Sequence, residues 1–127
     1  MRLFLVRHAE AAPGEPDELR PLTTAGRAVA RDLGERLVTE QPDAVVSSPL
    51  LRARETAEQI ARAAGLTPET DDRLAPGATA EDVQAAVAGR GATVIAVGHQ
   101  PDCSAITLDL TGRERDFAPG AVQEIHL

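Results

Sequence analysis

Three short apolar runs lie far apart in this chain, at residues 3–6, 44–46 and 93–97. Runs of this length that are rich in Leu, Val and Ile are typical of strands buried on both faces. Strands of that kind occur in parallel sheets with helices over both faces. The three runs therefore predict the centre of a parallel sheet, and the segments between them must supply the helices.

The first two intervening segments carry helical patterns. A proline-containing loop at 11–21 precedes a helix that is expected to begin at Thr23-Thr24 and to end near Gln41-Pro42. The apolar face of this helix is expected to carry Val29, Ala30, Leu33 and Leu37. A second helix is expected to begin with Ser48 as N-cap and Pro49 at its first position, and to close at Gly65.

The rest of the chain continues the alternation. Residues 66–79 are expected to form a loop, a short helix should begin at Thr79 or Ala80, and another should follow Pro101. Residues 122–127 alternate in polarity and predict an edge strand. This order predicts an α/β fold with three α/β/α layers, a mostly parallel central sheet, and a single domain over residues 1–127.

Charge and composition exclude several classes of function. The net charge is −7, so neither nucleic acid nor an anionic membrane is an expected partner. The chain has no lysine, and all of its basic side chains except histidine are arginines. No apolar run is long enough for a membrane span or a signal peptide, which predicts a cytoplasmic protein. Cys103 is the single cysteine, so no intramolecular disulfide can form.

Polar residues follow each of the three predicted central strands. His8 follows the first and His99 the third, while Arg52 lies in the turn of the helix after the second. The carboxyl ends of parallel strands share one rim of a sheet, and ligands of open α/β folds bind there. With Arg7, these side chains predict a site for a phosphoryl group, because the arginine fork binds phosphate oxygens in pairs. The two arginines oppose a metal cation, so neither a metal nor a cofactor is expected.

Five segments, in order and over residues 2 to about 110, resemble the histidine phosphatase superfamily, which is phosphoglycerate mutase-like, in its SixA-like phosphohistidine phosphatase branch. They are 5–11 (LVRHAEA), 22–26 (LTTAG), 47–57 (SSPLLRARETA), 74–77 (LAPG) and 97–101 (VGHQP). The resemblance implies that His8 is the nucleophile, that Arg7 and Arg52 clamp the phosphoryl oxygens, and that His99 donates a hydrogen bond to them. Such a nucleophile needs an unprotonated ring nitrogen, with its other nitrogen donating to a backbone carbonyl.

The proton donor is the missing part of the pattern. Gln100 stands where the acid phosphatase branch of the family has an acidic residue. Glu10, Asp72 and Glu81 are the candidate donors, with the neighbouring Asp71 and Asp82 as further carboxylates. An alkoxide leaving group needs a general acid, whereas imidazole is a better leaving group. A site without an acid therefore predicts phosphohistidine in a protein as the substrate. We also expect a role in signal transduction and a monomeric enzyme.

Three other hypotheses remain open from the sequence. One is a small-molecule phosphomonoesterase or mutase-like enzyme, which a carboxylate near the pocket would support. Another is a phosphate-binding module without catalysis, against which the presence of both His8 and His99 argues. The third is a metal hydrolase built on His8, Glu10, His99 and Asp102, which the neighbouring arginines oppose. Cys103 as a nucleophile competes with its simpler role as a small buried residue.

Overall fold

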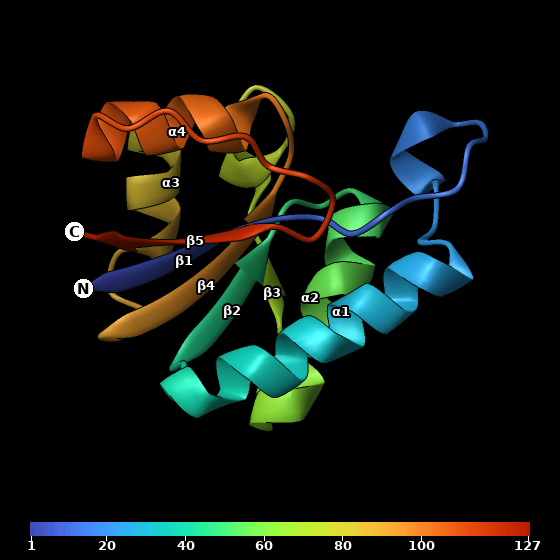
Figure 1. Ribbon diagram of the computed structural model, residues 1–127, viewed down its shortest axis with the longest axis horizontal. Coiled ribbons are helices and arrows are strands. Elements are labelled where there is room, and N and C mark those ends of the chain that lie inside the picture. Colours follow the sequence, from blue (N-terminus) through green and yellow to red (C-terminus); the bar gives the residue numbers. More distant parts are fainter.

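The computed structural model describes residues 1–127, and one five-stranded sheet forms its centre (Figure 1). The strand order is β3-β2-β4-β1-β5. The strands are β1 (Arg2–Arg7), β2 (Ala44–Ser47), β3 (Glu69–Thr70), β4 (Thr93–Gly98) and β5 (Val122–His126). All neighbours are parallel except β5, which pairs antiparallel with β1 at the edge. The mostly parallel α/β sheet and its edge strand confirm the sequence-based prediction.

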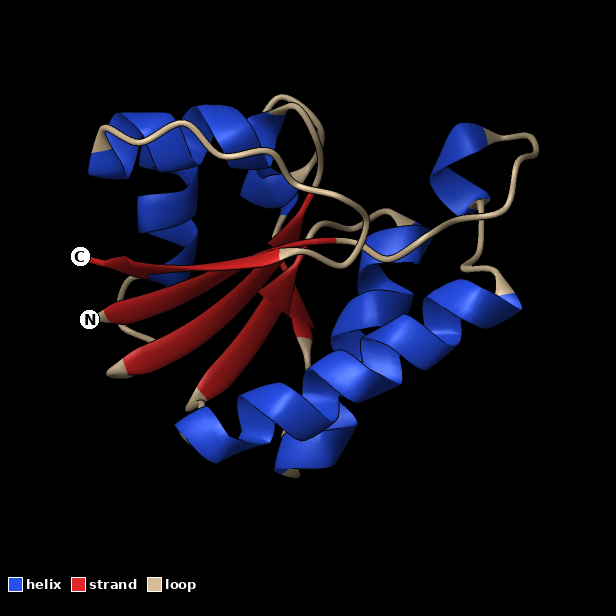
Figure 2. Cartoon of the chain, viewed as in Figure 1, coloured by secondary structure: helices blue, strands red, loops and turns tan.

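Helices cover both faces of the sheet and complete three layers (Figure 2). One face carries α1 (Thr24–Leu37), which continues into the 3-10 turn η2 (Val38–Glu40), and α2 (Leu51–Ala64). The opposite face carries α3 (Ala80–Val87) and α4 (Asp102–Thr111). None of these helices is long and apolar enough to cross a membrane.

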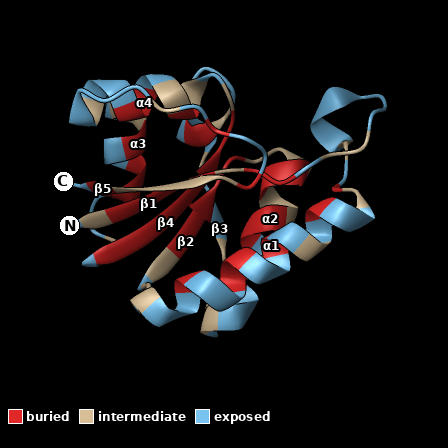
Figure 3. Cartoon of the chain, viewed as in Figure 1, coloured by how far each residue is buried: buried red, intermediate tan, exposed pale blue.

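The buried residues form one apolar layer on each side of the sheet (Figure 3). Successive side chains of a strand point to opposite faces, so Leu3 and Leu5 of β1 pack toward α3 and α4, while Phe4 and Val6 pack toward α1 and α2. Every residue of β4 is buried. Continuous apolar runs at the centre of the sheet follow from this burial on two faces.

The apolar face of α1 differs from the prediction at Val29, which is 42% exposed. Small residues determine how α1 packs, because a Cβ atom on Gly34 would lie 2.8 Å from the carbonyl oxygen of Gln59 on α2. The close contact at Gly34 turns this side of the helix toward α2, so Val29 lies at the margin, beside the turn at Gly120. The prediction for Val29 was wrong because it assumed that the large apolar side chains face the core, whereas the close packing of α1 on α2 at a glycine sets the orientation of the helix.

The start of α2 also differs from the prediction. The helix begins at Leu51, and its N-cap position is Leu50, which makes no side-chain capping bond. Ser48 and Pro49 lie before the helix rather than in its first turn. The predicted close at Gly65 is confirmed, with φ at 69°.

The segment at 66–79, predicted as a loop, contains two short elements. These are the strand β3 and the 3-10 turn η3 (Asp72–Leu74). β3 has only two residues, both exposed, and neither is apolar, so no periodic pattern marked it. Edge strands of this length are set by pairing with their neighbour, here β2, rather than by their own sequence.

Candidate functional site

The chain segments that leave β1, β2 and β4 meet at one rim of the sheet. The backbone N–H of His8 donates to the carbonyl of Gly98 at 3.0 Å, and that of Ser48 donates to the carbonyl of Val97 at 3.0 Å. The rings of His8 and His99 consequently face each other with centroids 5.3 Å apart and planes inclined by 59°. The two histidines predicted at strand ends thus lie side by side.

His8 is held in one orientation by its own backbone neighbour. Its Nδ1 donates to the carbonyl of Ala9 at 2.7 Å. Because a carbonyl oxygen only accepts, this bond places the proton on Nδ1 and leaves the lone pair on Nε2 of the neutral ring. Burial lowers the pKa of His8 to about 4, and the charges of Arg52 and Arg7 act in the same direction. His8 is therefore a neutral imidazole with a free ring nitrogen at neutral pH.

His99 is 3% exposed and is paired with Ser48. Its Nε2 shares a hydrogen bond of 2.7 Å with the Ser48 hydroxyl, while its buried Nδ1 has no partner. Burial lowers the pKa of His99 to about 4, and charge on His8 and Arg52 lowers it further. Sequence reasoning missed Ser48 as a site residue, since serine before proline is an ordinary helix-start signal.

Arg52 lies in the first turn of α2 and is 8% exposed. Its guanidinium donates to Asp17 twice, to the backbone carbonyl at 2.9 Å and to the carboxylate at 3.2 Å. Asp17 belongs to the 3-10 turn η1 (Asp17–Leu19) within the opening loop, and it also pairs with Arg20 at 3.0 Å. Hydrogen bonding from Arg20 and the charge of Arg52 lower the pKa of Asp17. The Asp17 carboxylate thus uses one of the Arg52 donors that could otherwise bind an oxyanion.

Arg7, at the end of β1, is half-buried. Its Nη1 donates to the carbonyl of Phe117 at 2.9 Å, whereas its buried Nε has no partner. The turn before β5 is joined to the same strand end, because the N–H of Gly120 donates to the carbonyl of Arg7 at 3.1 Å. Arg7 retains donors for a ligand beside His8.

Residues of α2 support the loop that follows His8. The Thr56 hydroxyl accepts from the N–H of Ala9 at 3.1 Å and donates to the carbonyl of Arg52 at 2.8 Å. Gly26 allows the same loop to approach α1, since a Cβ atom there would lie 2.2 Å from the carbonyl oxygen of Glu10. One threonine and one glycine therefore fix the spacing between the histidine and the arginine.

The three predicted proton donors lie in exposed positions. Glu10 accepts a bond of 2.7 Å from the Thr23 hydroxyl, and Asp72 and Glu81 are exposed. None of the three has a hydrogen bond or ion pair with His8, Arg52 or His99. Asp17, which sequence reasoning did not single out, is the carboxylate that contacts the site, through Arg52. Its only signal was its place in the polar loop that borders the site.

Other chemistry considered from the sequence has little support in the geometry. No group of three or more His, Cys, Asp or Glu side chains is placed to hold a metal ion. Cys103 is fully buried in the apolar layer under α4, and burial raises the pKa of its thiol to about 12. A thiol in that state is a poor nucleophile.

The arrangement defines a class of chemistry. Two arginines and two neutral histidines lie at one rim, and the unprotonated Nε2 of His8 has no hydrogen-bond partner. Such a site is suited to binding a tetrahedral oxyanion and attacking it. The family comparison agrees, because residues 3–76 match the model of the histidine phosphatase superfamily, branch 1. The chain belongs to this superfamily.

Two sequence relatives are informative. A protein of Picosynechococcus sp. (strain ATCC 27264 / PCC 7002 / PR-6), itself uncharacterised, is 36% identical over 136 residues, which cover 96% of this chain and 82% of that protein. GpmB of Citrobacter koseri, assigned as a phosphoglycerate mutase, is 40% identical over 81 residues, or 58% of this chain and 37% of that protein.

The structural neighbours include SixA proteins. The protein histidine phosphatase SixA, solved with tungstate, superposes with a TM-score of 0.88 at 28% identity, over 100% of this chain and 88% of that one. A protein of Agrobacterium tumefaciens assigned to the SixA phosphohistidine phosphatases gives 0.81 at 28% identity, over 97% and 89% of the two chains. A mycobacterial glucosyl-3-phosphoglycerate phosphatase shares the fold, with a TM-score of 0.73 at 21% identity, over 97% and 88%. The α/β fold is thus phosphoglycerate mutase-like and SixA-like.

Proposed function

We propose that this protein is a phosphatase that removes the phosphoryl group from phosphohistidine in another protein, with His8 as the nucleophile. The observation that carries the proposal is the bond from His8 Nδ1 to the Ala9 carbonyl, which leaves Nε2 free on a ring whose pKa the charges of Arg52 and Arg7 help to lower. The likeness to SixA, named as a protein histidine phosphatase, supports the substrate class. Arg7, Arg52 and His99 are assigned to binding the phosphoryl oxygens.

The reaction has two displacements. In the first, the lone pair of His8 Nε2 forms a bond to phosphorus, and the P–N bond of the substrate breaks with its electron pair returning to the substrate imidazole. In the second, a water oxygen bonds to phosphorus, the P–Nε2 bond breaks, and the electron pair returns to His8. The water gives up one proton to the solvent and inorganic phosphate leaves. Arg7 and Arg52 stabilise the charge on the phosphoryl oxygens in both steps.

The choice of a P–N substrate rests on the carboxylates around the site. Asp17 pairs with Arg52 and its pKa is lowered, so it is ionised at neutral pH and is a poor proton donor. Glu10, Asp72 and Glu81 make no contact with the histidines. Cleavage of a phosphate ester requires protonation of a leaving oxygen, which general acids accelerate about 10²–10⁴-fold. Imidazole leaves without that help, so phosphohistidine is the substrate that this set of residues serves best.

Replacement of the nucleophile tests the mechanism. The substrate is a synthetic peptide phosphorylated on its single histidine, and the comparison substrate is p-nitrophenyl phosphate. His8→Ala is expected to remove hydrolysis of both, and wild-type enzyme quenched during turnover should carry acid-labile, alkali-stable phosphate on His8. His126→Ala is the matched control, because His126 is an exposed histidine at the end of β5. Full activity of His8→Ala, or phosphate on another residue, contradicts the proposal.

A small-molecule phosphomonoesterase or mutase-like activity is the second candidate. The partial similarity to GpmB favours it, although that match covers 37% of the relative. Ratios of kcat/KM separate the two candidates. The phosphohistidine peptide should be cleaved far faster than phosphoglycerate, whose alkoxide leaving group needs a proton, and equal rates would select the second candidate. p-Nitrophenyl phosphate releases a stable anion, so it reports on the nucleophile and not on the choice between the candidates. Cytoplasmic location and a monomeric state remain predictions beside this proposal.

A further inference from the structure

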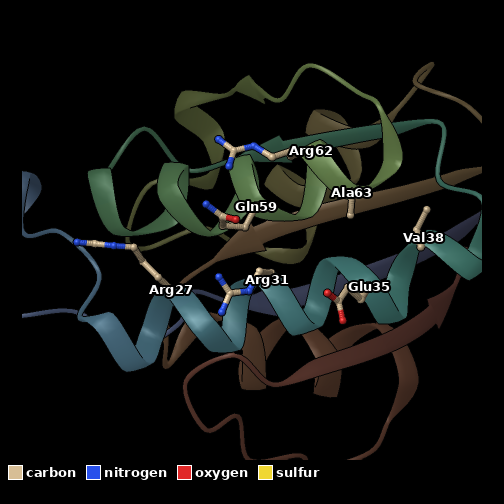
Figure 4. A pocket seen from close by; sticks show the side chains of 7 residues that line it. All are labelled: Arg27, Arg31, Glu35, Val38, Gln59, Arg62 and Ala63. Carbon is tan, nitrogen blue, oxygen red and sulfur yellow. The ribbon is translucent and has the colours of Figure 1, made fainter.

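A groove with a volume of about 580 Å³ runs between α1 and α2 on the outer surface of the molecule (Figure 4). It is lined by Arg27, Arg31, Glu35, Val38, Gln59, Arg62 and Ala63. The two helices approach closely at Gly34, where a Cβ atom would lie 2.8 Å from the Gln59 carbonyl oxygen. The helices are in contact below the groove, and long side chains from both helices form its walls.

The charge of the groove is opposite to that of the chain. Three arginines and one glutamate line it, although the whole chain carries −7. Arg27, Arg31 and Arg62 take part in none of the ion pairs of the structure. Arg27 and Arg31 are four residues apart on α1, where like charges repel. Three cations gathered without carboxylate partners favour an anionic ligand that offsets this repulsion.

The Arg27 end of the groove is joined by a hydrogen bond to the loop that contacts the phosphoryl site. Arg27 Nη1 donates to the carbonyl of Leu22 at 3.1 Å, at the end of the opening loop. The N–H of Leu22 donates to the Glu55 carboxylate of α2 at 2.8 Å. The same loop carries Asp17, which contacts Arg52. A macromolecule that reaches His8 past this loop therefore has the Arg27 end of the groove next to it.

We propose that the groove binds an acidic segment of the phosphohistidine-bearing protein, an inference that rests on the proposed function for the identity of the occupant. Glutamates or aspartates of that segment pair with Arg27, Arg31 and Arg62. Apolar residues of the segment cover Val38 and Ala63 at the other end. An acidic peptide fits better than a polynucleotide, because Glu35 and the net negative charge repel a uniform polyanion. The groove would thus select among proteins that carry phosphohistidine.

Binding of an acidic peptide tests the groove directly. The probe is a fluorescein-labelled peptide of alternating glutamate and leucine, measured by fluorescence anisotropy. The double variant Arg31→Glu/Arg62→Glu is expected to bind at least about tenfold more weakly than wild type, because attraction becomes repulsion at two positions. Arg36→Glu/Arg113→Glu is the matched control, since it makes the same change of net charge at two exposed arginines outside the groove. It should change the affinity less than about twofold.

The remaining outcomes overturn the inference. Loss of affinity that is equal in Arg36→Glu/Arg113→Glu would show that net charge alone matters, and no binding by wild type would remove the site. Tighter binding of single-stranded DNA or phosphatidylserine vesicles through the same arginines would assign a different occupant. Circular dichroism and unfolding midpoints confirm that each variant is folded. Because the assay involves no turnover, its result is independent of whether His8 accepts a phosphoryl group.

Discussion

Arg52 and Arg62 lie on one helix, at its two ends, and face opposite environments. Arg52 is 8% exposed and makes two hydrogen bonds to Asp17. Arg62 is exposed, lines the groove and has no ion-pair partner. The same residue type on the same helix is therefore held by hydrogen bonds at one end and is exposed to solvent at the other. The difference comes from burial, because a desolvated guanidinium must be satisfied, whereas an exposed one is solvated by water.

This contrast separates two kinds of recognition. Buried charges act strongly over short distances and demand defined partners, which suits the charge that develops on a phosphoryl group. Exposed charges are screened and tolerant of geometry, which suits the steering of a protein surface. A variant at each position should therefore fail in a different way.

The largest effect is expected at the pocket arginine. Arg52→Ala should lower kcat/KM for the phosphohistidine peptide and for p-nitrophenyl phosphate by about 10²–10³-fold, because it removes donors aimed at transition-state charge. Arg52→Lys should recover little of this, since a single ammonium does not replace the two-pronged fork. Arg62→Ala is the control on the same helix. The measurement is kcat/KM from steady-state kinetics with both substrates. A comparable loss of kcat/KM in Arg62→Ala would contradict the distinction between the phosphoryl site and the groove.

Burial of the two histidines should appear as a shift of their titration. His8 and His99 are expected to titrate near pH 4, with a proton affinity about 300-fold weaker than at the ordinary pKa of 6.5. The unfolded chain binds more protons between these values, so the free energy of unfolding should fall as the pH is lowered from 6.5 to 4. Ring carbon and nitrogen chemical shifts measured by NMR check this, with the urea-unfolded protein as reference. Titration of either ring near 6.5 in the folded protein would contradict the burial argument.

Sequence reasoning found the charges but not their partners. The apolar runs placed His8 and His99 at one rim, because strand burial and parallel order are encoded by local pattern. The roles of Asp17 and Ser48 were not predicted, because a loop carboxylate and a serine before proline acquire these roles only when distant segments meet. The error at Val29 has the same origin, because Gly34 sets the approach of α1 to α2. Tertiary contacts overrode local preference in each case.

Loss of the hydrogen bond between Ser48 and His99 should lower kcat by a few-fold to about tenfold. Ser48→Ala removes the hydroxyl that holds His99 Nε2, and a net hydrogen bond of this type contributes about 0.5–1.5 kcal/mol. The expected result is a lower kcat for the phosphohistidine peptide with a smaller change in the free energy of unfolding. Ser104→Ala is the control, because the Ser104 hydroxyl accepts from Gln100 and donates to the carbonyl of Arg115 but bonds neither histidine ring. Activity equal to wild type in Ser48→Ala would show that His99 is positioned by packing alone.

The smallest effect, and the sharpest test of the comparison, concerns Asp17. Its carboxylate gives Arg52 the partner that Arg62 lacks, and it competes with a phosphate oxygen for the same guanidinium. Asp17→Asn removes the competing charge but keeps the backbone carbonyl that accepts from Arg52 Nη1. Inhibition by inorganic phosphate or tungstate should therefore tighten only a few-fold, because the Asp17 carboxylate is exposed and its charge is screened by solvent. Weaker inhibition would mean that Asp17 holds Arg52 in place rather than competing for it, and the pocket arginine would then depend on its carboxylate partner for geometry.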